Sequence, residues 1–286
     1  MTERSAPPRV DMGGIRERTA LFAGGILVVA ALIATLFWAV PSIARSRIQI
    51  LAHRGASAYA PENTLASFKL AIEQRADWLE FDIQQTRDGQ LVVFHDLRLE
   101  RTTNGQGSIR DVTLDQLRAL DAGAWFDQKF AGERVPTFDE VVQLARDSGT
   151  RIFPEVKEPR FGPGMEERVV AVLRKYNYED MAIVQSFDER SLDRLHALSP
   201  TLRLALLYTR ENPWRGAPPS YANVLGPEWS LVAADRDATR SVQATGRQVV
   251  AWTVDTPQAA RQMIDARVDG IITNKPDMVR AMLDRQ

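Results

Sequence analysis

The chain has 286 residues, 44% of them hydrophobic, which is enough for one large domain with a full-sized core and one further segment. Its formal net charge of -1 gives no electrostatic basis for binding nucleic acid. Because the sequence has no cysteine, it excludes disulfides, thiolate metal sites and cysteine nucleophiles, and it leaves the redox compartment open.

An apolar segment follows the short N-terminal tail of residues 1–19. This segment, residues 20–40, has 21 residues and no charge. At about 1.5 Å per residue its length matches the hydrocarbon core of a bilayer, which is about 30 Å thick. A buried helix is rarely apolar on every face, and the apolar part of a cleaved signal peptide usually has about 7 to 15 residues, although residues 42–44 resemble a cleavage site. We therefore predict one uncleaved transmembrane helix, followed by a linker at residues 41–48.

The arginines beside the apolar segment favour a cytoplasmic N-terminus, since four precede the segment and three follow it. The large domain, residues 49–286, would then lie outside the cytoplasm. The expected location is therefore a membrane, which the chain would cross once. The oligomeric state stays open.

Beyond the linker, short apolar runs typical of strands alternate with helical patterns. Eight strands in about 240 residues, connected through helices, predict an α/β fold of the (β/α)8 TIM-barrel type. The expected strands are Gln49–His53, Trp78–Ile83, Arg151–Val156, Met181–Gln185, Leu202–Tyr208, Ser230–Ala234, Gln248–Val254 and Gly270–Thr273. The sixth lies beside several prolines, which break regular structure. One helical pattern runs from Asn63 to Gln74, with Asn63 or Thr64 as the expected N-cap.

A hairpin interrupts this alternation after the second strand. The dipeptide Asp88-Gly89 between two strand-like runs is typical of a hairpin with a two-residue type I′ turn. That turn would place His95 opposite Asp82. Residues 97–140 would then form an insertion before the barrel resumes.

Carboxylates gather at the predicted strand ends, where the active sites of such barrels lie. Glu80 and Asp82 are two apart on the second strand and so point to the same face, and Glu155 ends the third strand. Three carboxylates that converge there would repel one another unless they share a cation. Because oxygen ligands favour a hard ion, the predicted cofactor is one divalent cation, Mg²⁺ or Ca²⁺.

Two histidines and two cations accompany these carboxylates. His53 ends the first strand and, with His95, would flank the ion. One histidine would take a proton from the attacking oxygen while the other protonates the leaving alkoxide, because the imidazole pKa suits proton transfer near neutrality. Arg54 and Lys157 would neutralise an anionic ligand. The combination predicts phosphodiester hydrolysis.

Other aromatic and histidine residues have a less specific context. Trp252 would either line the mouth of the barrel or fill its core. His196 is expected on a helix surface. Trp125, Phe126 and Phe130 of the insertion would either pack it onto the barrel or offer an apolar wall to an acyl chain.

A series of motifs, in order over nearly all of Ile50 to Pro276, resembles the glycerophosphodiester phosphodiesterase family. The motifs are HRG (53–55), PENT (61–64), LEFD (79–82), TRDG (86–89), VVFHD (92–96), RTTNGQG (101–107), PEVK (154–157), SFD (186–188), WTVD (252–255) and DGIITNKP (269–276). The resemblance implies a TIM barrel with an insertion after the second strand. It also implies metal-dependent hydrolysis of glycerophosphodiesters to glycerol 3-phosphate and an alcohol.

The resemblance also implies roles for individual residues. These are His53 and His95 as the acid and base pair, Glu80, Asp82 and Glu155 as metal ligands, and Arg54 and Lys157 as phosphate ligands. Glu62 would either contact a substrate hydroxyl or support the site, and Trp252 would contact substrate. The family usually carries asparagine where this chain has Asp255 and aspartate where it has Asn274. Both departures lie away from the expected metal ligands, so they bear on substrate contacts.

Two alternative functions stay open. The apolar segment suggests a lysophospholipase D type reaction on lysophospholipids, and the same fold could also serve a non-catalytic phosphate-binding protein. The expected partners are a small glycerophosphodiester and the membrane, without nucleic acid. The sequence does not specify the alcohol, the ion, or whether water or a neighbouring hydroxyl attacks.

Overall fold

Eight parallel strands form the predicted barrel in a computed structural model that describes residues 47–157, 162, 164–211 and 217–285. The strands are β1 Gln49–His53, β2 Trp78–Gln85, β4 Arg151–Val156, β5 Ile183–Ser186, β6 Arg203–Tyr208, β7 Ala222–Pro227, β8 Gln248–Ala251 and β9 Gly270–Thr273. Because β1 pairs with both β9 and β2, the sheet closes on itself. Residues 1–46, with the expected membrane span, lie outside the described part. Within that part no helix is both long and apolar enough to cross a bilayer.

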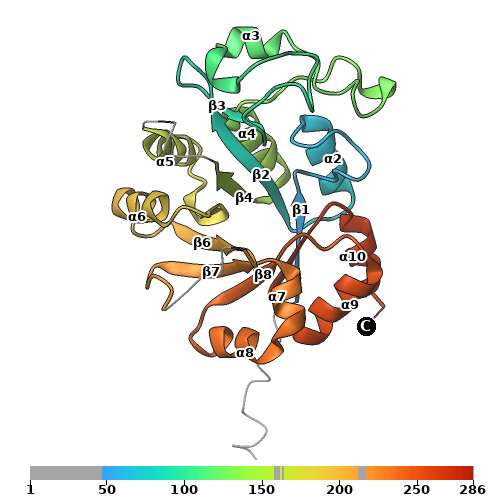
Figure 1. Cartoon of the computed structure of the whole chain (residues 1–286), viewed down its shortest axis with the longest axis vertical. Helices are drawn as coiled ribbons and strands as arrows, with labels where there is room; N and C mark the ends of the chain where they lie inside the picture. The colour runs from blue at the N-terminus through green and yellow to red at the C-terminus, as the bar shows by residue number, and fades with distance from the viewer. Residues whose placement is uncertain (1–46, 158–161, 163, 212–216, 286) are drawn as a thin grey trace, which may run out of the picture. The chain divides into compact units, whose positions relative to one another are not determined.

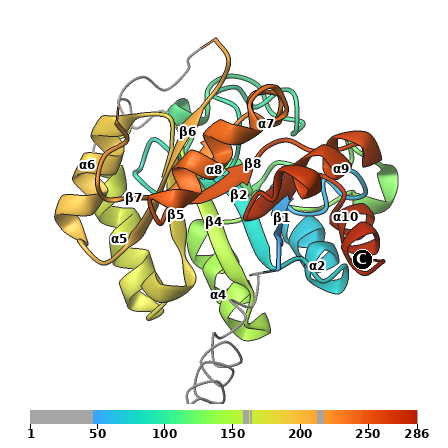
Figure 2. The ribbon, with the colours of Figure 1, turned by 90° about the horizontal axis from the view of Figure 1, so that it is seen from below.

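Helices cover the outside of the barrel (Figures 1 and 2). They are α2 Leu65–Glu73, α4 Phe138–Ser148, α5 Met165–Lys175, α6 Glu189–Leu198, α7 Trp229–Ala234, α8 Arg236–Ala244, α9 Pro257–Ala266 and α10 Pro276–Leu283. Short 3₁₀ turns are η1 Ile109–Asp111, η2 Gln128–Phe130 and η4 Glu179–Met181. Of the two expected N-caps of α2, Thr64 has the role, since its side chain accepts the Ser67 N–H. Asn63 instead has a left-handed backbone with φ 58°.

One apolar residue from each barrel strand contributes to a single buried cluster. Its members are Leu51, Trp78, Phe153, Ile183, Ala205, Val224, Val250 and Ile272. Side chains from all eight strands can meet only inside the barrel. Since residues two apart on a strand face the same side, the next inward positions lie one step closer to the C-terminal end. Those positions include His53, Glu80 and Glu155.

The sixth barrel strand differs from the one predicted. Residues 230–234 belong to helix α7, and the strand is β7, which pairs with β6 and β8. A short apolar run does not distinguish a strand from a helix. Asn223 and Gly226 weaken the strand pattern of β7, and Pro227 is tolerated because it ends the strand. The other strands lie where predicted, with ends shifted by a few residues.

The hairpin after β2 is present, but the predicted register is wrong by one residue. Its second strand, β3 Leu91–Val93, runs antiparallel to β2, and the amide of Phe94 donates to the carbonyl of Asp82. Phe94, not His95, therefore lies opposite Asp82. His95 belongs to the irregular segment that follows.

The register changes because the turn has three residues instead of two. The Gly89 N–H donates to the Thr86 carbonyl, and the Thr86 N–H donates to the Gln90 carbonyl. Gly89 has a positive φ of 81°, whereas Asp88 does not, and a type I′ turn needs positive φ at both. The turn is therefore a three-residue loop with a glycine in the left-handed conformation.

The insertion has a small core of its own. That core also takes in two residues of the hairpin, and its buried members are Val92, Phe94, Leu99, Ile109, Leu117, Ala122 and Val135. It contains α3, Leu114–Arg118, and lies beyond the tips of β2 and β3 (Figure 1). Thr137 caps α4, so the predicted end of the insertion at Glu140 falls inside the first turn of that helix.

We predict that Gly89→Ala lowers the free energy of unfolding by about 1–2 kcal/mol, the cost of a left-handed conformation for a residue with a side chain. Gly89→Asn should cost less, because asparagine tolerates this conformation better. Chemical denaturation measures both, with Lys69→Ala on the exposed face of α2 as the control. Unchanged stability of Gly89→Ala would contradict the observed turn.

Candidate active site

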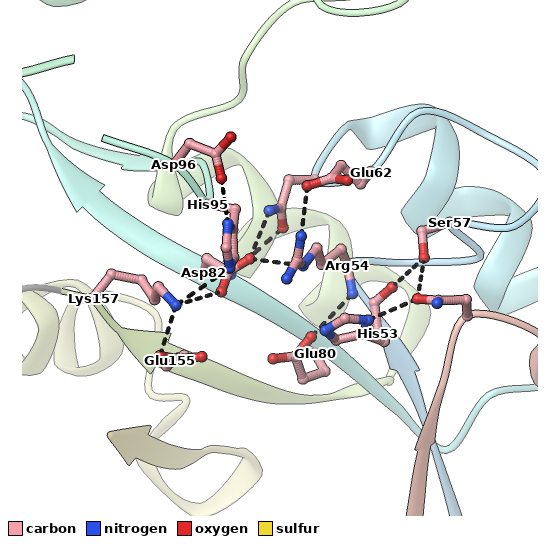
Figure 3. Close-up of polar contacts among 12 residues, drawn as sticks. His53, Arg54, Ser57, Glu62, Glu80, Asp82, His95, Asp96, Glu155 and Lys157 are labelled. Carbon is pink, nitrogen blue, oxygen red and sulfur yellow. Dashed lines mark hydrogen bonds and ion pairs between the residues drawn. The ribbon is translucent and has the colours of Figure 1, made fainter. Parts of the chain in front are cut away.

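Charged side chains lie one step beyond the apolar cluster, toward the C-terminal end of the barrel. They point toward one another (Figure 3). His53 ends β1 and is paired in register with Glu80 of β2. Asp82 of β2 is in register with Glu155 of β4, and Lys157 follows β4 directly. Neighbouring parallel strands therefore bring together the five residues that the sequence placed at strand ends.

The three carboxylates are buried and close together. Glu80, Asp82 and Glu155 each offer an oxygen within 4.8 Å of the others. Burial, together with the charges of Asp82 and Glu155, raises the pKa of Glu80 well above its usual range. Burial also raises the pKa of Glu155 to about 7, although Lys157 opposes the shift. The cluster therefore favours additional positive charge among its oxygens.

Two amides that the sequence analysis missed hold these carboxylates in place. Gln185 Nε2 donates to Glu80 Oε1 at 2.7 Å, and Asn63 Nδ2 donates to Asp82 Oδ2 at 2.8 Å. Both had a signal in the sequence. Gln185 is a polar residue at an inward position of β5, and Asn63 belongs to the PENT motif.

The HRG motif is explained by the backbone around Arg54. Arg54 and Gly55 both have positive φ, 56° and 85°. A Cβ at Gly55 would lie 2.1 Å from Ser67 Oγ, so only glycine fits. The Arg54 side chain donates to Glu62 at 2.8 Å, and its Nε lies 3.3 Å from Asp82 Oδ2. This geometry directs the guanidinium into the acidic cluster.

Lys157 approaches the cluster from another direction. Its Nζ lies 3.1 Å from Glu155 Oε1 and 3.9 Å from Asp82 Oδ1. Arg54 and Lys157 together hold the pKa of Asp82 below its usual value, since their charges outweigh the effect of burial. The cluster thus combines one carboxylate of low pKa with two of raised pKa.

His53 is held from the side by Asn274, the residue after β9. Its Nδ1 lies 2.7 Å from Asn274 Oδ1, and burial, with the nearby charge of Arg54, lowers the His53 pKa to about 4. Asn274 in turn donates to Asp255 through its backbone and its amide. The two departures from the family pattern therefore contact each other, and Asn274 also contacts a candidate catalytic histidine, which goes beyond the expected effect on substrate contacts. The sequence carries a signal for this contact, because the two departures are reciprocal: one carboxylate is lost and one is gained.

His95 is held by a chain of charges from the insertion. Its Nδ1 lies 2.5 Å from Asp96 Oδ1, and Arg101 donates both to Asp96 and, through two nitrogens, to Glu62. Hydrogen bonds from Arg101 and His95 outweigh the effect of burial and lower the pKa of Asp96 to about 2. Glu62, held by Arg54 and Arg101, lies in a position that suits structural support.

A cavity of about 180 Å³ opens over these groups. Its lining residues are His53, Arg54, Glu80, His95, Glu155, Lys157, Gln185, Phe187, Leu207, Trp252, Thr253 and Ile272. Trp252 both lines it and packs on the apolar cluster below, edge-on to Phe187 at 5.6 Å between ring centroids. Trp125, Phe126 and Phe130 instead contact one another within the insertion. One wall of the cavity is therefore charged and the other is apolar.

Known proteins are similar to this chain over most of its length. The model of the glycerophosphoryl diester phosphodiesterase family matches residues 53–278. A glycerophosphodiester phosphodiesterase of Caldanaerobacter subterraneus is 40% identical over 231 residues, which are 80% of this chain and 94% of the relative. One from Bacillus subtilis is 34% identical and covers 81% of this chain and 85% of the relative.

A solved structure adds a ligand to the comparison. A phosphodiesterase of Oleispira antarctica in complex with the product sn-glycerol-3-phosphate superposes with a TM-score of 0.75 at 29% identity. The match covers 82% of this chain and 96% of that chain.

We predict that Arg101→Ala lowers the free energy of unfolding by about 1–2 kcal/mol, because Glu62 and Asp96 lose charged hydrogen-bond partners. Arg98→Ala is the matched control, since Arg98 is exposed in the same insertion and its carboxylate partner is Glu100; it should cost at most about 1 kcal/mol. Denaturant titration compares the two. Equal losses would show that the Arg101 contacts contribute no more than a surface pair.

Proposed function

The chain belongs to the glycerophosphoryl diester phosphodiesterase family, and from that premise we propose that it hydrolyses glycerophosphodiesters with one divalent cation and a pair of histidines. As an enzyme of this family it is a phosphoric diester hydrolase, and its products would be glycerol 3-phosphate and an alcohol. The observation that carries the proposal is the meeting of three buried carboxylates, two cationic side chains and two histidines around one cavity.

The donor set fits a hard divalent cation. Glu80, Asp82 and Glu155 would hold it, because carboxylate oxygens are the ligands that Mg²⁺ and Ca²⁺ prefer. The raised pKa values of Glu80 and Glu155 support the fit. Besides burial, repulsion from neighbouring carboxylates raises these pKa values, and a cation among the three oxygens would offset that repulsion. When bound, such an ion supplies positive charge that stabilises the charge developing on phosphoryl oxygens.

The cationic side chains would bind and orient the phosphodiester. Arg54 and Lys157 both line the cavity, and each lies beside Asp82. A guanidinium offers several donors in a plane, which suits two phosphoryl oxygens, while the ammonium of lysine acts as a point charge. Both are buried enough for their interactions with phosphate to be strengthened by the low local dielectric.

The two histidines would move protons. Both line the cavity, so either ring can face the diester. One takes a proton from the attacking oxygen, and the other protonates the oxygen of the leaving alcohol. Burial lowers the pKa of both histidines, which favours a neutral imidazole ready to accept a proton.

The substrate is proposed to be a water-soluble glycerophosphodiester. In support, the Oleispira antarctica relative is described with sn-glycerol-3-phosphate, and the insertion aromatics do not line the cavity. The alternative of a lysophospholipid draws on the apolar wall of Phe187, Leu207 and Trp252, which could accept an acyl chain. We also propose that residues 20–40 hold the chain in a membrane with the catalytic domain outside the cytoplasm, on the basis of their length and lack of charge.

An assay of the full chain tests this function. We expect cation-dependent hydrolysis of glycerophosphocholine or glycerophosphoethanolamine, with little turnover of lysophosphatidylcholine, and loss of activity in EDTA. Glu155→Ala should abolish both activity and the rise in melting temperature on adding Mg²⁺ or Ca²⁺, because one carboxylate of the cluster is gone. Glu73→Ala, exposed at the end of α2, should leave both unchanged.

Full activity after EDTA treatment would contradict the proposed cation dependence. Turnover of lysophosphatidylcholine alone would move the assignment to the lysophospholipase D type reaction.

We predict that His95→Ala lowers turnover by roughly 100-fold or more, because the ring is expected to transfer a proton. His196→Ala is the control, since its ring stacks on Tyr221 away from the cavity. Steady-state kinetics at saturating cation measures both variants. Near wild-type turnover of His95→Ala would remove this residue from the proposed mechanism.

A further inference from the structure

An amide, rather than a carboxylate, faces the ring nitrogen of His53. Nδ1 of His53 lies 2.7 Å from Oδ1 of Asn274. The same Oδ1 lies 2.6 Å from the hydroxyl of Ser57, which also lies 2.7 Å from the carbonyl of His53. The Ser57 hydroxyl, which has one proton to donate, thus lies between the amide oxygen and the backbone carbonyl of the histidine.

Asp255 determines which way the amide of Asn274 points. The Asp255 carboxylate accepts from the backbone N–H of Asn274 at 2.8 Å, from its side-chain Nδ2, and from the hydroxyl of Thr273 at 3.2 Å. An ionised carboxylate can only accept hydrogen bonds, so the amide atom beside it must be the NH₂ group. The oxygen of Asn274 must then face His53.

The direction of the amide fixes the proton on the histidine. An amide oxygen can only accept, so Nδ1 of His53 must be the donor. In a neutral ring the other nitrogen, Nε2, then carries the lone pair. No hydrogen bond to Nε2 is present within the described residues, and His53 lines the cavity. The free lone pair is therefore available to a ligand.

We propose that Asn274, oriented by Asp255, is a positioning residue that holds His53 in a single tautomer, with the proton on Nδ1 and the lone pair of Nε2 available to the cavity. Only the role of this tautomer in proton transfer rests on the proposed function. The tautomer itself follows from the hydrogen-bond network.

The partners of the two histidines are unlike. His53 faces a neutral amide, and the charge of Asp255 lies one residue further away. His95 faces the carboxylate of Asp96 through Nδ1, while the ammonium of Lys157 lies 3.4 Å from its Nε2. The network around His53 therefore assigns it as a proton acceptor.

In the reaction, the attacking oxygen forms a bond to phosphorus as its proton passes to Nε2 of His53. The bond from phosphorus to the leaving oxygen breaks, and that oxygen takes a proton from His95, which would have to enter this step protonated. Throughout, Nδ1 of His53 keeps its proton and its hydrogen bond to Asn274. Each ring returns to its starting state by exchange of one proton with water.

Nuclear magnetic resonance tests the tautomer directly. The chain has three histidines, so labelling histidine with ¹⁵N gives three ring systems, which spectra of His95→Gln and His196→Gln assign. In the full chain near neutral pH we expect a protonated Nδ1 and an unprotonated Nε2 for His53. Asn274→Leu removes the acceptor, so the two nitrogen signals should move toward those of a mixture of tautomers. A protonated Nε2 in the wild type, or unchanged signals in Asn274→Leu, would overturn the proposal.

Two further variants keep the test decisive if Asn274→Leu does not fold. Asp255→Asn preserves the size of the side chain but removes the charge that orients the amide, so it should also mix the tautomers. Tyr59→Phe is the control, because it removes a hydrogen bond between the same two regions, to Asp277, without contacting His53. Tautomer mixing by Tyr59→Phe as large as that by Asp255→Asn would contradict a specific role for Asp255.

Kinetics then connects the tautomer to catalysis. Asn274→Leu should lower kcat roughly 10- to 100-fold with little change in KM, as for other residues that orient a functional imidazole through its second nitrogen. Asn274→Asp alone would place two carboxylates beside each other. In the double variant, Asp255→Asn with Asn274→Asp, the new carboxylate at position 274 can accept from Nδ1 of His53, and the new amide at position 255 can donate to that carboxylate. The double variant should recover most of the lost turnover, which is a coupling between contacting residues.

These results separate the two proposals. A wild-type chain without activity on glycerophosphodiesters would count against the proposed function, while the resonance experiment would still measure the tautomer. A mixture of tautomers in an active wild-type enzyme would overturn the role of Asn274 alone.

Discussion

The site depends on one electrostatic constraint, which is that three carboxylates share a buried space less than 5 Å across. Glu80, Asp82 and Glu155 repel one another there, and their burial weakens the screening by water. Every polar contact around them reduces this repulsion in some way. Arg54 and Lys157 supply positive charge, while Gln185 and Asn63 donate hydrogen bonds to the oxygens that face them. A divalent cation would neutralise the negative charge of the three carboxylates that these contacts leave uncompensated.

The barrel supplies the geometry for this constraint. Its interior is closed by the apolar cluster, so the next inward residues of each strand must meet above that cluster. The parallel pairing of β2 with β4 sets Asp82 beside Glu155, and that of β1 with β2 sets His53 beside Glu80. The insertion completes the site, because it carries Arg101, whose hydrogen bonds to Asp96 and Glu62 join the segment after β3 to the segment between β1 and α2. A rigid scaffold therefore places groups from distant parts of the sequence within hydrogen-bond distance.

Much of this arrangement could be predicted from the sequence, because strand ends of a barrel share one rim. Glu80 and Asp82 are two residues apart, so their common face followed from strand geometry alone. The position of β7 could not be predicted, since the apolar run that resembles a strand lies in α7. The hairpin register failed for a local reason: an Asp-Gly pair suits both a two-residue and a three-residue turn. The contact of Asn274 with His53 joins two strands far apart in sequence, and only the closed barrel reveals it. The membrane helix at residues 20–40 stays a prediction, since it lies outside the described residues.

Titration calorimetry of the full chain with Mg²⁺ and with Ca²⁺, in buffers that differ in ionisation enthalpy, tests the central claim most directly. The account predicts binding of one ion with a net release of protons near pH 7, because the pKa of Glu155 lies at about 7 and that of Glu80 is also raised in the absence of the ion. Lower pH should weaken the binding, since protons then compete for the same oxygens. Absence of binding, or binding without proton release, would contradict the claim that the three carboxylates are organised around a shared cation.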